Sequence, residues 1–162
     1  MKKVILSLIM MLSIATLKAQ DNAIDKITTS YLGVKNALVG SNSTLAKSRS
    51  KELLATLSAP VKGLQPAQQK VLATYLTKLQ FDSRHISETT VIDHQREHFA
   101  SLSKNMYALL AGLNMNSTTV YQQYCPMKKA YWLSETEEIR NPYYGDDMLE
   151  CGKVTATLKA GK

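Results

Sequence analysis

Cysteine, tryptophan and long apolar runs are scarce in this sequence, which has 162 residues but only two cysteines and one tryptophan. The two cysteines, Cys125 and Cys151, are too far apart to form a Cys-x-x-Cys redox pair. The sequence also contains no Gly-x-Ser-x-Gly elbow, no phosphate-binding glycine loop and no His-Glu-x-x-His pair. These absences predict that the protein is not an enzyme.

A cluster of basic residues with interleaved aromatics is also absent, although the formal net charge is +7. Three of the lysines, Lys2, Lys3 and Lys18, belong to the N-terminal segment. Without them, 17 basic residues face 13 acidic ones, and the net charge falls from +7 to +4. The remaining lysines are scattered, so the electrostatic surface of a nucleic-acid-binding protein is missing. We therefore expect no nucleic-acid partner.

The N-terminal segment has the pattern of a secretory signal peptide. Lys2 and Lys3 precede an apolar run from Val4 to Leu17, which is 14 residues long. A membrane-spanning helix needs about 20 apolar residues, whereas a signal peptide has a shorter run followed by a cleavage site. We expect residues 1–19 to be removed and residues 20–162 to be a single periplasmic domain without membrane insertion. Because no cysteine directly follows the run, we expect no lipid anchor.

Residues 22–114 show the three- and four-residue spacing of apolar side chains that is typical of amphipathic helices. The expected helices run from 22 to Gly40, from the Ser-Asn-Ser at 41–43 to just before Pro60, from Pro66 through Leu79, and from about Ser87 to Leu113. Glycine and proline lie at their boundaries, where they are favoured. Short connections between four such helices predict an antiparallel four-helix bundle.

Residues 117–162 have a different composition. The strings "NSTTVYQQY" and "KVTATL" are rich in Thr, Val and Tyr, and "RNPYYGDD" contains turn-forming residues. We expect a small lobe of short strands and ordered loop, packed on the bundle by Trp132, Tyr143 and Tyr144. The predicted fold class is therefore mainly α, a four-helix bundle with a small C-terminal lobe.

Both cysteines of this lobe have a methionine close by. Pro126 forces Cys125 into an extended conformation, and side chains two residues apart in an extended chain project from the same side. This predicts that the thiol of Cys125 and the thioether of Met127 lie together. Met148 and Cys151 are three residues apart, so a single helical turn would bring them to one face. The loop therefore offers two pairs of sulfur atoms.

Thiolates and thioethers are soft ligands that favour Cu(I), and by the same chemistry Ag(I). Zinc is an alternative that would accept the cysteines but needs histidine rather than methionine to complete a tetrahedral site. His94 and His98 lie four apart in "IDHQREHF", and His98 falls at the edge of the apolar stripe. If the lobe packs there, His98 becomes a further ligand. The predicted metal ligands are Cys125, Met127, Met148, Cys151 and His98.

A disulfide between Cys125 and Cys151 is the competing interpretation. Cysteines in an exported protein pair readily, and such a bridge would stabilise the fold by about 3–4 kcal/mol in the chain-entropy model. The protein would then be a metal-free module that presents "IRNPYYGDD" to a protein partner. The same thiols cannot be bridged and bind a metal at once, so both interpretations stay open at this point.

The strings "YCPM", "AYWL", "IRNPYYG" and "MLECG", together with "YLGVKNALV" and "QREHFASLS", resemble a bacterial periplasmic family of uncharacterised domains. Members of that family also occur fused to the adaptor subunits of copper and silver efflux systems. The resemblance implies handling of a heavy metal, copper first, outside the inner membrane, and no catalysis. An efflux adaptor is the protein partner that it implies. Carried over to this chain, the motif positions are Cys125, Met127, Met148 and Cys151, with His98 in the helical motif.

Overall fold

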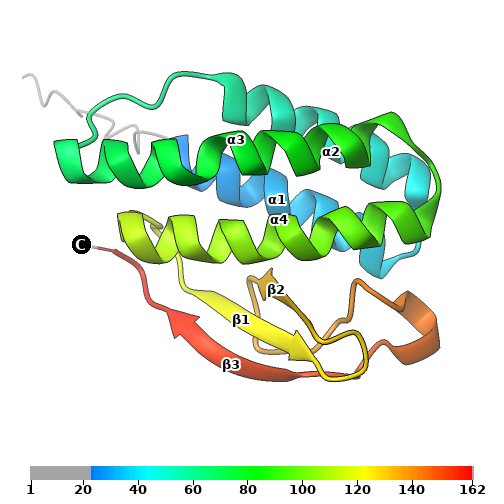
Figure 1. Cartoon of the computed structure of the whole chain (residues 1–162). Coiled ribbons are helices and arrows are strands. Elements are labelled where there is room, and N and C mark those ends of the chain that lie inside the picture. The colour runs from blue at the N-terminus through cyan, green and yellow to red at the C-terminus, as the bar shows by residue number, and fades with distance from the viewer. Residues whose placement is uncertain (1–22, 162) are drawn as a thin grey trace, which may run out of the picture.

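The computed structural model describes residues 23–161. The expected signal segment, residues 1–19, lies outside the described residues. The helices are α1 (Ala23–Val39), α2 (Ser43–Ser58), α3 (Pro66–Glu88) and α4 (Ile92–Leu113). Consecutive helices pack side by side and reverse direction at short connections (Figure 1). The four helices and a small three-stranded sheet confirm the predicted fold class. No described helix has the length and apolar character needed to cross a membrane.

The boundary between the third and fourth helices differs from the prediction, which began the fourth helix at about Ser87. Instead, α3 continues to Glu88 and α4 begins at Ile92. The buried stripe of α3 extends through Ile86, which is 0% exposed, and the Ser87 hydroxyl donates a hydrogen bond back to the Arg84 carbonyl. Packing and this local bond therefore keep Ser87 within the third helix.

The C-terminal lobe is an antiparallel sheet of β1 (Val120–Cys125), β2 (Ala130–Ser134) and β3 (Lys153–Leu158), in the order β2-β1-β3. The composition predicts the strands in the first and third of these segments. A 3₁₀ helix, η1 (Gly145–Met148), lies in the long connection between β2 and β3. The sheet lies below α4, and η1 lies at the end of the molecule where α3 turns into α4 (Figure 1).

Large side chains of the lobe complete the core of the bundle. Trp132 is 0% exposed, and its ring meets that of Tyr143 edge-on with centroids 6.1 Å apart. Tyr143 in turn lies 5.9 Å from the ring of Phe99 on α4. The hydroxyl of Tyr31 on α1 accepts a hydrogen bond of 3.0 Å from the Leu133 amide on β2. The lobe is thus joined to the helices by both apolar packing and directed hydrogen bonds.

Burial of two tyrosines makes the fold sensitive to alkali. Burial raises the pKa of Tyr31 and of Tyr143 above the ordinary value of 10.0. Above pH 10.0 the unfolded chain therefore loses these protons before the folded chain does. The free energy of unfolding should then fall as pH rises, by about 1.4 kcal/mol per pH unit for each tyrosine. Urea unfolding between pH 9 and pH 11 measures this slope.

The variant Tyr31→Phe provides the control for this measurement. It removes one of the two groups, so its slope should be shallower than that of the wild type by about one tyrosine's share. Equal slopes in the two proteins would show that Tyr31 does not carry the alkaline effect.

Candidate metal sites

The first candidate site forms where strand β1 ends. Residues 126–129 form the turn that joins β1 to β2, and Lys129 completes it with a φ of 54°. Cys125 is the last residue of the strand and is 0% exposed, whereas Met127 lies in the turn and is 62% exposed. The prediction that the two side chains project from one side of an extended chain is therefore wrong, because the extended conformation ends at Cys125.

The second cysteine reaches this turn from the connection that contains η1. The expected helical turn between Met148 and Cys151 is present, since the Cys151 amide donates a hydrogen bond of 3.1 Å to the Met148 carbonyl. Asn141 is 0% exposed and fixes the ends of this connection. Its side-chain amide donates to the Cys151 carbonyl at 2.8 Å, and its side-chain oxygen accepts from the Tyr143 amide at 2.8 Å.

The two thiols meet at the turn, with their sulfur atoms 4.0 Å apart. Each sulfur accepts a hydrogen bond from a backbone amide of that turn. The Lys128 amide donates to Cys125 at 3.4 Å, and the Met127 amide donates to Cys151. Partial burial, with the adjacent Cys125 thiol, raises the pKa of Cys151, while the Met127 amide acts in the opposite direction. The raised pKa favours the protonated form of the Cys151 thiol, beside an amide that would stabilise its thiolate.

The methionines differ in their relation to the thiols. Met127 contacts Cys151 through its backbone amide, while its side chain is exposed. Met148 is partly buried and lies one 3₁₀ turn before Cys151. The structure therefore brings the thiols of Cys125 and Cys151 together directly. Met127 follows Cys125 closely in the chain, and Met148 closely precedes Cys151.

His98, the fifth predicted ligand, lies in a different group. Among the described residues, the His, Cys, Asp and Glu side chains that could hold one ion are His85, His94 and His98. One nitrogen from each of these rings lies within 4.8 Å of the others. His98 comes from α4 and points to α3, where its Nδ1 lies 3.0 Å from Oδ1 of Asp82. A group of three histidines that could hold a metal ion is thus a second candidate site.

Ring contacts define the arrangement of this histidine cluster, which consists of His85, His94 and His98. The rings of His85 and His98 stack at 4.5 Å with an angle of 7° between their planes. The ring of His94 is inclined to His98 by 69° at 4.7 Å. Phe81 lies 4.4 Å from His85 and 5.9 Å from His98, and covers one side of the cluster.

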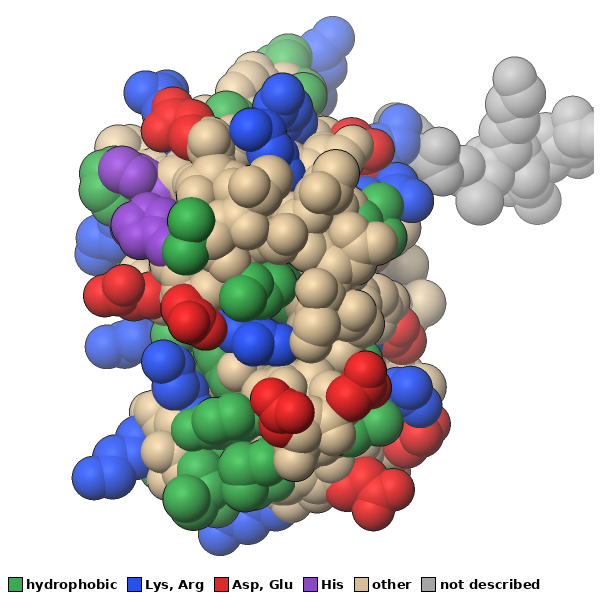
Figure 2. Space-filling view, turned by 90° about the vertical axis from the view of Figure 1, so that its right-hand side faces the viewer, with side chains coloured by type: hydrophobic (Ala, Val, Ile, Leu, Met, Phe, Trp, Pro, Cys, Tyr) green, Lys and Arg blue, Asp and Glu red, His purple; other side chains and the backbone are tan. Residues whose placement is uncertain are grey.

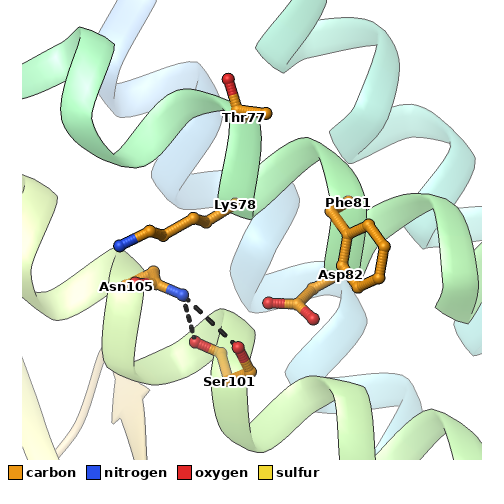
Figure 3. Close-up of a pocket in the computed structure, with 6 residues that line it drawn as sticks. All are labelled: Thr77, Lys78, Phe81, Asp82, Ser101 and Asn105. Atoms are coloured by element: carbon orange, nitrogen blue, oxygen red, sulfur yellow. Dashed lines mark hydrogen bonds between the residues drawn. The ribbon is translucent and has the colours of Figure 1, made fainter.

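A groove of about 310 Å³ between α3 and α4 adjoins the cluster. Phe81 and Asp82, which both contact His98, also line this groove. Figure 3 shows the Asp82 carboxylate pointing across the groove toward α4, where Asn105 and Ser101 are joined by hydrogen bonds. The carboxylate is 4% exposed, so its position beside His98 is fixed by the packing of the two helices.

Sequence reasoning missed His85, since it considered only the spacing within the fourth helix. The sequence does, however, contain a signal that places His85 near His94. Two antiparallel helices joined by a short connection pair the residues that lie at equal distances from that connection. His85 and His94 lie at similar distances before and after residues 89–91, so they face each other once the helices pair.

Comparison with known proteins gives one match. Residues 27–118 match the model of a family described as a protein of unknown function (DUF3347). The match begins within α1, includes the histidine cluster, and ends before β1, so both cysteines lie beyond it. No curated protein and no solved structure matches the chain. Because the matched residues make up more than half of the sequence, the chain belongs to this family of unknown function.

Proposed function

We propose that this protein binds Cu(I), and by the same chemistry Ag(I), through the thiolates of Cys125 and Cys151. The meeting of the two thiols, 26 positions apart in the chain, with sulfur atoms 4.0 Å apart is the observation that carries the proposal. A metal ion about 2.3 Å from each sulfur, a usual metal–thiolate distance, would see the pair at an angle of about 120°. That angle leaves room for a third ligand.

The amides of the turn support a site for thiolates. A hydrogen bond to the charged form of a group favours that form. The Lys128 and Met127 amides point at the two sulfurs and would stabilise their negative charge when a metal replaces the protons. A disulfide, in contrast, carries no charge for these amides to stabilise.

The remaining donors near the pair favour a soft ion. Met127 and Met148 are the sulfur donors adjacent to it in the chain, and thioethers select Cu(I) over hard cations. Met127 is 62% exposed, so its side chain can turn toward the thiols without disturbing the core. His98 belongs to the histidine cluster, so the nitrogen ligand that zinc would need is not supplied from there.

The role that we infer is sequestration of the ion, or its delivery to an efflux system, outside the inner membrane. The N-terminal pattern supports export, and the resemblance to domains fused to efflux adaptors supports such a partner. Transfer to a partner requires an accessible ion. Cys151 is only partly buried and Met127 is exposed, so the site opens to the surface on this side.

The alternative of a disulfide-fixed interaction module loses part of its binding surface in the structure. Its proposed contact segment is "IRNPYYGDD", but Asn141 is 0% exposed and Tyr143 is 3% exposed. Tyr143 also donates its hydroxyl to the Tyr131 carbonyl. The centre of this segment thus holds the lobe together and is not available to a partner.

Titration of the reduced, untagged protein with Cu(I) under anaerobic conditions, against a competing chelator, tests the proposal. We expect one ion per chain and loss of both reactive thiols as the ion binds. Protein purified without reductant should still contain two free thiols. Bridged thiols, combined with no Cu(I) binding after reduction, would overturn the proposal and favour the disulfide.

Replacement of each methionine by leucine tests the third ligand, because leucine keeps the volume and removes the sulfur. We expect Met127→Leu or Met148→Leu to lower the Cu(I) affinity by about tenfold, which corresponds to about 1.4 kcal/mol. Met106→Leu is the matched control, since Met106 is 1% exposed in the core of α4 and should leave the affinity unchanged. Wild-type affinity in the double variant Met127→Leu/Met148→Leu would remove the thioethers from the site.

A further inference from the structure

We propose that His85, His94 and His98 form a second metal site, which takes a divalent first-row ion such as Zn²⁺ or Cu²⁺. This site has nitrogen ligands only and is separate from the thiol pair, so it does not depend on the proposed Cu(I) function. The sequence contains three histidines in all, and the structure gathers every one of them in this cluster.

The distances between the three ring nitrogens suit one ion once the rings move slightly closer together. A tetrahedral ion with nitrogen ligands at about 2.0–2.1 Å holds those nitrogens about 3.4 Å apart. The three ring nitrogens already lie within 4.8 Å of one another. The rings are partly exposed, so rotation about their side-chain bonds can bring the nitrogens closer without moving the helices. Figure 2 views the molecule from the right-hand side of Figure 1 and shows histidine side chains next to one another on this surface.

Asp82 orients one of the three ligands. In the tautomer of His98 that carries its proton on Nδ1, this N–H donates to the Asp82 carboxylate across the 3.0 Å contact, since a carboxylate oxygen accepts. Nε2 of His98 is then the nitrogen with a free lone pair. Histidine ligands of metals commonly make such a bond to a carboxylate, which fixes both the tautomer and the ring orientation. The side chain of Asp82 is 4% exposed, so this partner is held firmly in place.

Hydrogen bonds from Gln95 hold the helices that carry the histidine cluster together. The side-chain amide of Gln95, next to His94, donates to the Ser43, Ile86 and Thr89 carbonyls. These bonds tie the start of α4 to the end of α3 and to the start of α2. The backbone positions of His85 and His94 are therefore fixed relative to each other, as a preformed site requires.

The donor set separates this site from the thiol pair. Imidazole suits Zn²⁺, Cu²⁺ and Ni²⁺, and among divalent ions Cu²⁺ binds most tightly to a given set of nitrogen ligands. Cys151 follows η1 closely in the chain, and His85 and His94 flank the turn from α3 to α4. Figure 1 shows η1 at the end of the molecule where α3 turns into α4. The protein would thus present two metal sites at one end: the thiol pair for a soft ion such as Cu(I), and the histidine cluster for Zn²⁺ or Cu²⁺.

Calorimetric titration with Zn²⁺ tests the inference, using the variant Cys125→Ser/Cys151→Ser without an affinity tag so that neither thiols nor added histidines bind. We expect one Zn²⁺ per chain and at least a 30-fold loss of affinity in His85→Gln and in His94→Gln. Glu97→Gln, an exposed position on α4, is the control and should bind as its parent does. Asp82→Asn should weaken binding by about 10- to 100-fold.

Imidazole ¹⁵N spectra provide the second measurement, because every histidine signal of this chain comes from the cluster. On addition of Zn²⁺, all three rings should shift in the Cys125→Ser/Cys151→Ser protein. Absence of Zn²⁺ binding, or equal binding after His85→Gln and His94→Gln, would overturn the second site and leave the thiol site untouched. The cluster would then be a set of stacked rings with a packing role.

Discussion

Replacement of both cysteines by serine is expected to lower the Cu(I) affinity by at least about 100-fold. Loss of an outer partner of a metal ligand already costs about 10- to 100-fold, and this change removes two ligands outright. Each tenfold loss corresponds to about 1.4 kcal/mol, so the expected loss is about 3 kcal/mol or more. Competition with a Cu(I) chelator under anaerobic conditions measures it.

The fold of this variant must be checked, because Cys125 is 0% exposed and a serine hydroxyl there needs a hydrogen bond. Cys125→Ala/Cys151→Ala avoids the buried hydroxyl and should lose Cu(I) binding to the same extent. If either double variant that retains its melting temperature binds Cu(I) as tightly as the wild type, the thiols are not the ligands.

Each single replacement should also weaken binding strongly, since a lone thiolate with thioethers cannot reproduce the pair. The two positions differ in their surroundings. Cys125 ends a strand in the core, whereas Cys151 lies on a partly exposed connection. Cys151→Ser should therefore alter the stability less than Cys125→Ser does, while the two should reduce the Cu(I) affinity similarly.

The fold follows from the sequence because its signals are local. Apolar spacing of 3.6 residues, Gly40, Pro60 and Pro66 define most helix boundaries without knowledge of the tertiary structure. The boundary at Ser87 is different, because packing of Ile86 extends α3 beyond the point that local signals indicate. Strand β2 also depends on tertiary context, since Trp132 and Leu133 are buried against the helices and not arranged in simple alternation.

The candidate sites follow from the sequence only in part, because each joins segments that are distant in the chain. Pro126 correctly predicts an extended Cys125, but the turn that starts there separates Met127 from it. The meeting of Cys125 with Cys151 depends on the long connection that contains η1. The histidine cluster depends on two helices, so the spacing of His94 and His98 alone does not reveal that His85 lies beside them.

Asn141 determines where Cys151 lies, and its replacement by aspartate is expected to affect both stability and metal binding. The side-chain amide of Asn141 donates to the Cys151 carbonyl at 2.8 Å, and its backbone amide donates to the Leu149 carbonyl at 2.7 Å. Aspartate keeps an oxygen for the Tyr143 amide but puts a carboxylate against the Cys151 carbonyl. A buried carboxylate that faces a carbonyl oxygen and has no donor there costs about 2–4 kcal/mol.

We expect Asn141→Asp to lower the free energy of unfolding by this amount and the Cu(I) affinity by at least about tenfold, as Cys151 is no longer held beside Cys125. Burial should raise the pKa of the new carboxyl above about 3.9, the ordinary value. Its protonated form can donate to the Cys151 carbonyl, so the stability deficit should shrink as pH falls and grow as pH rises through the folded pKa. Asn105→Asp is the matched control, because in the described part of the chain the Asn105 side chain donates to Ser101, one turn earlier in α4. If Asn141→Asp loses stability but binds Cu(I) as the wild type does, the position of Cys151 is set by the turn amides alone.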